Sequence, residues 1–492
     1  MKKKILALVL ALAICVGIVG CGGDTGDNTN PSTSTEPSKG TVDKITDFGG
    51  YDFTIADWYT IDGETEFTSS WLEFVDSYQK QLQKDYNFKY YRSSSFIDGD
   101  YTQFVPAKIM AGDTDVKMYY FFEGYILPSV SQNLLWDLNE LDSFDPTDLK
   151  WNQNSINTFT INGGTYAVEA QYNRPLMGCF YNKRILAEAG LDPDLPYDLQ
   201  AEGKWNWDAL EDICAKVTQD TNKDGVTDIW AWGSTYGNFA LTAAWSNGAS
   251  FVLRDETTGK YIDGTTTPEF LEAMEWMQEM TKKGYLYTKP QGGSGSYAME
   301  AFRDGKLAFL PYNFWAADEA YVGECVDDWG WVYLPYGDSA EGITMCVQSN
   351  GYGIPKTLSK DEAEKVFQIF DLFTDLYVEG INNDWTIEGA DEYEETFWID
   401  TVANSVRDSR SVDETLQSML FNNERVLFDY VRMIPGYNYA FTSEIVNLRM
   451  TPQEAIESFR PGNQAAINTI NNVQKKIDFI VFWRGHRKPV NG

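Results

Sequence analysis

The sequence predicts an α/β fold, because strand-like segments alternate with amphipathic helices along most of the chain. The alternation is clearest near the start, where strands at residues 52–59, 88–91 and 115–121 are separated by helices at 69–86 and 101–111. Such alternation is typical of a largely parallel sheet covered by helices. With 43% hydrophobic residues, the 492-residue chain can supply cores for two domains.

The first strand and helix show why these elements are expected. Residues 52–59 (DFTIADWY) alternate in polarity and end on polar and aromatic groups. The helix at 69–86 carries Trp71, Phe74, Val75, Tyr78 and Leu82 at helical spacing. Ligands of open α/β sheets bind beyond the carboxyl ends of the strands. The residues expected there are Asp57, Trp58, Tyr59, Tyr119 and Tyr120.

The rest of the chain continues the pattern. We expect β-type runs within 163–181, strands at 229–232, 306–311, 329–335 and 345–355, and a hairpin around 255–261. The expected helices are at 183–190, 207–217, 268–283, 298–304, 361–374 and 452–473.

The amino terminus indicates export. Lys2, Lys3 and Lys4 precede an apolar run that is short for a membrane span, and Cys21 follows small residues. This pattern resembles bacterial lipoprotein signals, which implies removal of residues 1–20 and diacylation of Cys21; a transmembrane anchor helix is the alternative. The lipidated cysteine then starts a linker, residues 21–48, that is mostly small and polar and is expected to be flexible rather than packed on the domain.

The net charge and the histidine and cysteine content exclude several classes of function. Losing three of the 39 basic residues with the leader leaves 36 against 73 acidic ones, and the net charge of about −37 argues against nucleic-acid partners. The single histidine, His486, excludes histidine-based triads and histidine metal sites. Four further cysteines match no metal motif, and we favour buried free thiols over disulfides for them. They are Cys179, Cys214, Cys325 and Cys346.

Residues 220–228 (DTNKDGVTD) have the spacing of a calcium-binding loop. Oxygen side chains occupy loop positions 1, 3, 5 and 9, and a glycine at position 6 allows the sharp turn. Position 12 is Ala231 instead of the usual Glu, so an Asp/Gly turn without metal is the alternative to a structural Ca²⁺ site. The expected ligands are Asp220, Asn222, Asp224, the carbonyl of Val226, and Asp228.

Several longer motifs occur in a characteristic order. They are YAVEA (166–170), FYNKRILAEAGLD (180–192), KWNWDALEDI (204–213), AMEAFRDGKLAFLPYNFW (298–315), WGWVYLP (329–335), GYGIPKTLSKDEAEKVFQIFDLF (351–373) and TPQEAIESF (451–459). Together they resemble the extracellular solute-binding proteins of carbohydrate ABC importers, which include maltodextrin-binding proteins. The resemblance implies a periplasmic-binding-protein fold of type II, with two α/β lobes of separated chain segments that close over a ligand around a hinge.

The resemblance also implies domain boundaries. The amino-terminal lobe would comprise residues 49–167 and 352–395, and the carboxyl-terminal lobe residues 168–351 and 396–474, with hinge strands near 168–171 and 346–351. Residues 475–492 contain FIVFW followed by RGHRK and extend past the family pattern, so an extra packed strand and a surface-associating tail both stay open.

A set of ligand contacts follows from the same resemblance. Trp and Tyr rings offer apolar faces to sugar rings, while Asp and Glu accept hydrogen bonds from sugar hydroxyls. Aromatic residues make up 15% of the chain, more than a core of this size requires, which also favours carbohydrate. The implied residues are Asp57, Trp58, Tyr119, Glu169, Tyr236, Trp315 and Tyr437, with ordinary packing as the alternative for each aromatic.

We therefore expect a monomeric, non-enzymatic binding subunit of an ABC importer, lipid-anchored to the outer face of the cell membrane. It would capture a sugar or oligosaccharide between its lobes and deliver it to membrane permease subunits. Three alternatives stay open: a binding protein for another small solute, a binding lipoprotein that feeds a membrane sensor, and a glycoside hydrolase or lyase. The length and linkage of the sugar are not determined by the sequence.

Overall fold

The computed structural model describes residues 44–57, 70–93, 101–148, 150–170, 177–255, 257–290, 295–317, 321–346, 348–375, 408–416, 418–419 and 426–485. The expected signal peptide, the lipidation site at Cys21 and the side chain of Trp58 lie outside these ranges. Within them, no helix combines the length and the apolar character needed to cross a membrane.

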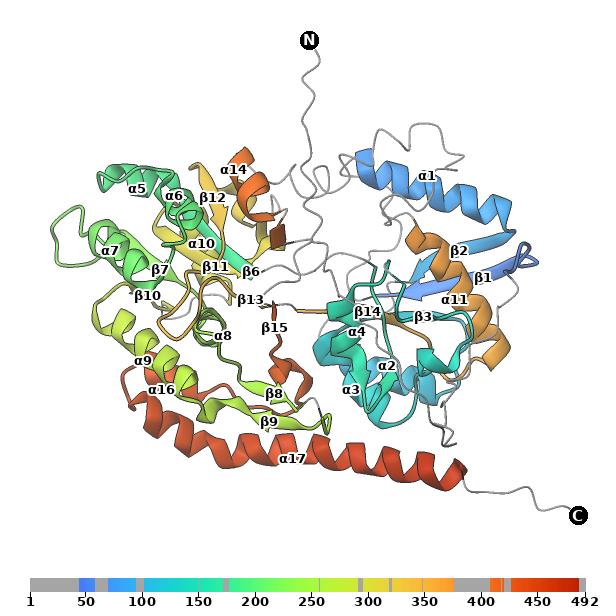
Figure 1. Cartoon of the computed structure of the whole chain (residues 1–492). Coiled ribbons are helices and arrows are strands. Elements are labelled where there is room, and N and C mark those ends of the chain that lie inside the picture. Colours follow the sequence, from blue (N-terminus) through green and yellow to red (C-terminus); the bar gives the residue numbers. More distant parts are fainter. Residues whose placement is uncertain are drawn as a thin grey trace, which may run out of the picture. The chain divides into compact units, whose positions relative to one another are not determined.

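The first sheet has the strand order β14-β3-β1-β2 (Figure 1). Its strands are β1 (Tyr51–Ala56), β2 (Phe88–Ser93), β3 (Met118–Phe122) and β14 (Asn350–Gly353). Strand β1 pairs in parallel with both β2 and β3, while β14 pairs antiparallel with β3. The helices between the first three strands are α1 (Ser70–Asp85) and α2 (Tyr101–Met110). The alternation predicted for this part of the chain is therefore confirmed.

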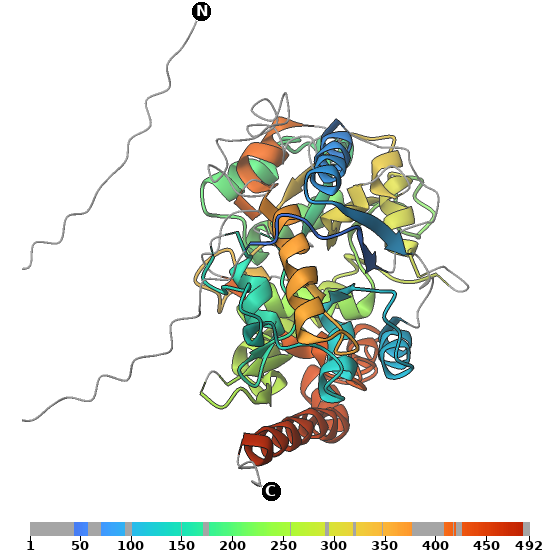
Figure 2. The ribbon, with the colours of Figure 1, turned by 90° about the vertical axis from the view of Figure 1, so that its right-hand side faces the viewer.

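Helix α11 (Lys360–Thr374), orange in Figure 2, packs on this sheet. It begins with a capping box, in which Ser359 and Glu362 each accept a hydrogen bond from the other's backbone amide. One face is apolar, and Phe370 stacks on Trp151 with ring centroids 5.9 Å apart and planes 8° apart. This packing fixes a late helix on a sheet built mainly from the start of the chain.

The second sheet has the strand order β10-β7-β11-β6-β12. Its strands are β6 (Met177–Asn182), β7 (Trp230–Gly233), β10 (Leu286–Tyr287), β11 (Leu307–Asn313) and β12 (Trp329–Val332). Strand β7 pairs in parallel with β10 and β11, whereas β6 pairs antiparallel with β11 and β12. The helices of this part are α5 (Lys183–Glu188), α6 (Leu195–Ala201), α7 (Trp207–Val217), α8 (Tyr236–Ser246), α9 (Pro268–Lys282) and α10 (Tyr297–Arg303). The sheet is mixed.

Helices α6 and α8 are absent from the sequence expectation. In α8 every residue from Phe239 to Ser246 is buried, so its sequence has no polar stripe. The amphipathic pattern that identifies a surface helix is therefore missing. Helix α7 has that pattern and an Asn206 cap, and it spans the expected residues.

The segment at 345–355, expected as one strand, forms two. Strand β13 (Met345–Cys346) pairs in parallel with β15 (Val426–Leu427), whereas β14 pairs with β3. The prediction of a single strand is wrong, because the chain leaves one pairing partner and joins another at Gln348 and Ser349. We call these two residues the crossing.

The remaining elements are short, except for the last helix. They are α3 (Glu123–Ser131), α4 (Gln153–Phe159), β4 (Thr160–Ile161), β5 (Gly164–Thr165), β8 (Val252–Arg254), β9 (Tyr261–Asp263), α14 (Ser409–Ser411), α16 (Phe441–Val446), α17 (Pro452–Gly485) and the single turns η1 (Leu138–Glu140), η2 (Gly264–Thr266), η3 (Phe314–Ala317), η4 (Val322–Glu324), η7 (Val412–Leu416) and η8 (Tyr430–Met433). Helix α17 extends past the expected residue 473, so an extra strand at 479–483 is contradicted.

The four cysteines named above, Cys179, Cys214, Cys325 and Cys346, are buried free thiols, and the preference for this state is confirmed. Burial raises the pKa of the Cys179, Cys214 and Cys346 thiols. They therefore stay protonated, which makes them poor nucleophiles and poor metal ligands.

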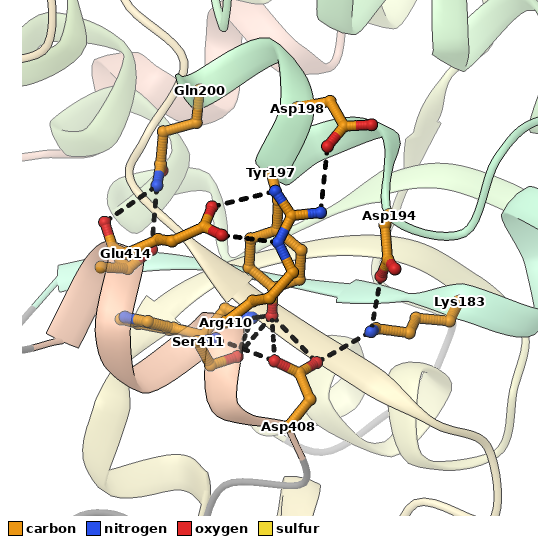
Figure 3. Close-up of polar contacts among 11 residues, drawn as sticks. Lys183, Asp194, Tyr197, Asp198, Gln200, Asp408, Arg410, Ser411 and Glu414 are labelled. Atoms are coloured by element: carbon orange, nitrogen blue, oxygen red, sulfur yellow. Dashed lines mark hydrogen bonds and ion pairs between the residues drawn. The ribbon is translucent and has the colours of Figure 1, made fainter. Parts of the chain in front are cut away.

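A polar network fastens α14 and η7, which come late in the chain, to α5 and α6 (Figure 3). The Tyr197 hydroxyl donates to Asp408 (2.9 Å) and also bonds Ser411 (2.6 Å). Lys183 pairs with Asp408 at 2.8 Å. Ser411 accepts a hydrogen bond from the Trp331 amide of β12 (2.9 Å), which anchors the network on the second sheet.

The Asp429 carboxylate ties α8, β8 and η8 together. It is 7% exposed and accepts four hydrogen bonds. The donors are Trp245 Nε1 (2.9 Å) and the amides of Phe251 (2.9 Å), Val252 (3.1 Å) and Val431 (3.0 Å). Burial raises the pKa of this carboxyl, and its donors oppose the rise. Asp429 therefore positions η8, which carries part of the candidate site.

Replacing Asp429 with Ala should lower the free energy of unfolding by about 3 kcal/mol or more, because several buried donors lose their acceptor. Chemical denaturation measures this loss. The control Asp115→Ala removes an exposed carboxylate and should stay within about 0.5 kcal/mol of the parent. Equal stabilities of the two variants would contradict the role of Asp429.

Candidate functional site

The topology brings the carboxyl ends of several strands to common edges. In the first sheet Ala56 pairs with Tyr119, so β1 and β3 end at the same edge, where antiparallel β14 begins. In the second sheet β7 and β11 are parallel, so Tyr236 after β7 and Trp315 after β11 share one edge. Edges of this kind are where α/β sheets bind ligands.

Asp57 and Tyr119 lie below the surface of the first edge. The Asp57 carboxylate is fully buried, and its Oδ2 lies 2.6 Å from Nη2 of Arg92. Tyr119 is also fully buried, and burial raises the pKa of its hydroxyl. Both side chains belong to the core of the edge in this structure, so neither presents its polar group at the surface.

Tyr312, Trp315 and Tyr321 form what we call the aromatic platform. Trp315 is 47% exposed and Tyr321 is 40% exposed. The Trp315 ring meets both tyrosines edge-on, with centroids 5.5 Å from Tyr312 and 5.0 Å from Tyr321. An indole this exposed, and fixed by two rings, presents an apolar face to solvent. Only Trp315 is predicted from the sequence, although Tyr312 lies three residues before it in the same motif.

Glu169, Tyr236 and Tyr437 occupy different settings. Glu169 is half-buried. It directly follows Val168, which forms an isolated β-bridge with Tyr352 of β14. Tyr236 is half-buried in the first turn of α8, at the same edge as Trp315. Tyr437 is 8% exposed and packs against Tyr439, with centroids 5.3 Å apart. The structure therefore brings Tyr236 and Trp315 to one edge and places Tyr437 in the core.

Arg432 of η8 joins the platform to the crossing. Its guanidinium carbon lies 5.4 Å from the ring centroid of Phe122, at the end of β3. The Gln348 side-chain oxygen, in the orientation that satisfies both groups, accepts from Nε (3.1 Å) and Nη2 (2.9 Å). Burial raises the pKa of the Tyr312 hydroxyl, and the charge of Arg432 opposes this rise. No motif marks Arg432, since it lies between the last two of the ordered motifs.

Glu123, the first residue of α3, is a buried carboxyl at the crossing. Its amide donates to the Ser349 carbonyl (3.0 Å), and its Oε2 accepts from the Ser349 amide (3.1 Å). Burial raises the pKa of Glu123 to about 8, while the nearby charge of Arg432 opposes the shift. The carboxyl is therefore largely protonated at neutral pH. Glu123 follows β3 directly, only a few residues beyond the strand-end residues expected from the sequence.

The acidic loop at 220–228 is tightly turned. The two carboxylate oxygens of Asp220 accept hydrogen bonds from the Lys223 amide and the Gly225 amide, each at 2.7 Å. Asp228 accepts from two further loop amides. Carboxylate and amide oxygens suit a hard cation such as Ca²⁺. Among the described residues, no group of three His, Cys, Asp or Glu side chains could hold a metal, so the Ca²⁺ site stays a prediction.

Residues 61–374 match the family model described as "Bacterial extracellular solute-binding protein". No curated protein sequence matches the chain significantly.

Solved structures share the fold over most of their length. An ABC substrate-binding protein from Listeria monocytogenes in complex with cycloalternan is 18% identical, with a TM-score of 0.57, and the match covers 87% of this chain and 99% of that one. The cyclic alpha-maltosyl-1,6-maltose binding protein from Arthrobacter globiformis is 16% identical, with a TM-score of 0.59 and coverage of 86% and 100%. UgpB from Mycobacterium tuberculosis, in complex with glycerophosphocholine, is 17% identical, with a TM-score of 0.57 and coverage of 86% and 99%. The predicted α/β fold of the periplasmic binding proteins is confirmed.

Replacing Glu123 with Gln should change how stability depends on pH. The pKa of Glu123 is about 8 in the folded protein against an ordinary value of 4.5, so the folded protein keeps a proton that the unfolded chain loses. The contribution of the Glu123 carboxyl to the free energy of unfolding is fully present below about pH 4.5 and is lost as the pH rises to about 8.

Thermal unfolding from about pH 4 to about pH 9 should therefore show the parent losing stability relative to Glu123→Gln, by a few kcal/mol at most. If the difference in stability between the two proteins stayed constant over this pH range, Glu123 would not be protonated in the folded protein.

Proposed function

The chain belongs to the bacterial extracellular solute-binding proteins, a non-enzymatic family, and from this premise we propose that it captures a sugar or oligosaccharide for an ABC importer. The aromatic platform carries the sugar assignment. Sugar rings have apolar C–H faces that stack on exposed indole and phenol rings, while their hydroxyls need polar partners. Arg432, whose charge acts on the Tyr312 hydroxyl of the platform, supplies a polar group there.

Two of the three relatives named above support a saccharide as the solute, whereas UgpB is in complex with glycerophosphocholine. The Listeria protein is in complex with cycloalternan, and the Arthrobacter protein is named for binding a cyclic maltosyl-maltose. A ligand of this kind suits a platform of three rings better than a small amino acid would.

Capture would proceed by closure of two lobes with the boundaries expected from the sequence: residues 49–167 with 352–395, and residues 168–351 with 396–474. The crossing at Gln348 and Ser349 would lie at the hinge, where a few residues absorb the change in backbone angles. The closed form would then dock on the permease subunits.

Lipidation of Cys21 would keep the binding protein at the outer face of the membrane. The support is the leader itself, with its three lysines, short apolar run and small residues before the cysteine. Two acyl chains give stable anchoring where one does not. A tethered binder stays at high effective concentration near its permease.

Replacing Trp315 with Ala should weaken saccharide binding by about 1 to 3 kcal/mol, because the stacking face is lost. Calorimetry against a panel of oligosaccharides measures the change. Met110→Ala is the matched control: it truncates an exposed apolar side chain at the far end of α2, away from the carboxyl edge of the first sheet. If no oligosaccharide released heat while an amino acid or peptide bound tightly, the sugar assignment would fall.

We also propose that the loop at 220–228 binds a structural Ca²⁺ through Asp220, Asn222, Asp224, Asp228 and the Val226 carbonyl. Calcium should then raise the melting temperature by a few degrees, and Asp224→Ala should remove the gain while leaving the calcium-free melting temperature nearly unchanged. Magnesium at equal concentration controls for ionic strength. An equal calcium response of parent and variant would count against the site.

A further inference from the structure

We propose that Arg432 binds an anionic group of the ligand, so that the solute is an acidic saccharide. This inference rests on the proposed saccharide function and specifies its substrate class. It concerns the guanidinium that lies between the aromatic platform and the crossing.

The guanidinium of Arg432 is held in place, but no carboxylate of the described residues pairs with it. The Phe122 ring supports one face, and the Gln348 oxygen binds Nε and Nη2. Nη1 has no hydrogen-bond partner among the described residues, and none of their carboxylates lies within 4.0 Å of Arg432. A fixed guanidinium with an unused edge suits bidentate binding of a carboxylate or phosphate.

Most other arginines of the described chain are neutralised by a carboxylate. The pairs are Arg92 with Asp57, Arg184 with Asp327, Arg303 with Glu324, Arg410 with Glu414, Arg449 with Glu444 and Arg460 with Asp263. Arg254 instead donates to Asn157 and to backbone carbonyls. In a protein with 73 acidic and 39 basic residues, an arginine at the site without a paired carboxylate is unusual.

The titratable groups that face Arg432 do not compensate its charge at neutral pH. Burial raises the pKa of Glu123 to about 8, so this carboxyl is largely neutral. Burial also raises the pKa of Cys346, Tyr312 and Tyr439, so all three stay protonated. The Asp429 carboxyl is held by four neutral donors and forms no ion pair with Arg432 within 4.0 Å. Among the described residues, the Arg432 guanidinium therefore has no direct carboxylate partner, which leaves its free edge for a ligand anion.

The position of Arg432 links charge to stacking. The charge of Arg432 opposes the rise in the pKa of the Tyr312 hydroxyl, and the Tyr312 ring contacts Trp315 edge-on. One sugar ring could therefore stack on the platform while an acidic substituent of the same or the next ring reaches Arg432. Gln348, which binds the guanidinium, belongs to the crossing. An anion bound to Arg432 would therefore lie one side chain away from the segment that joins β13 to β14.

The test uses calorimetry on the full mature protein with four probes: a galacturonate trisaccharide, its methyl ester, glucose 1-phosphate and maltotriose. The parent should bind the galacturonate at least about ten-fold more tightly than the neutral ester, and added salt should reduce the preference. Arg432→Gln should abolish the preference, and Arg432→Lys should retain part of it. Arg449→Gln, which removes an exposed arginine paired with Glu444, should leave it intact.

Preferential binding of glucose 1-phosphate would support an anionic ligand with phosphate as its source. Tighter binding of maltotriose than of either anionic probe, or an acid preference that survives in Arg432→Gln, would overturn the acidic substrate class and leave the saccharide function standing. If none of the four probes bound, the inference would fall together with the proposed function. The comparison of acid and ester on the parent needs no variant to fold.

Discussion

The reciprocal hydrogen bonds between Glu123 and Ser349 hold the chain where it passes from β13, which pairs with β15, to β14 of the first sheet. On the other side of the same short segment, Gln348 holds Arg432. Asp429 then fixes η8, the turn that carries Arg432, against α8 and β8. The residues that set the path of the chain are therefore next to those that form the candidate site.

Three buried acids in this region are accommodated in three physically different ways. Asp57 is neutralised by Arg92, and Asp429 is satisfied by four hydrogen-bond donors. Glu123 has a single amide donor to its side chain, and burial raises its pKa, so it keeps a proton. None of the three acids forms an ion pair with Arg432 within 4.0 Å, so the proposed anion contact at this arginine does not compete with a direct carboxylate partner among them.

Much of the fold follows from sequence patterns, and the exceptions have physical causes. Helix α7 is amphipathic and capped by Asn206, so its limits are predicted, whereas α8 is buried on nearly all sides and has no periodic pattern. The strand expected at 345–355 is divided because pairing partners are set by tertiary contacts that local sequence does not encode. Of the site, Trp315 is predicted because the motif at 298–315 resembles the family pattern. Arg432 is not, since its role depends on Phe122 and Gln348, which are distant in sequence.

If a saccharide stacks on the aromatic platform and reaches Arg432, a crystal structure of the protein with its bound saccharide should show both contacts. We expect a sugar ring in van der Waals contact with the Trp315 indole and an anionic oxygen within hydrogen-bond distance of the Arg432 guanidinium. A ligand bound elsewhere, with Trp315 still open to solvent and Arg432 without a contact, would contradict this expectation.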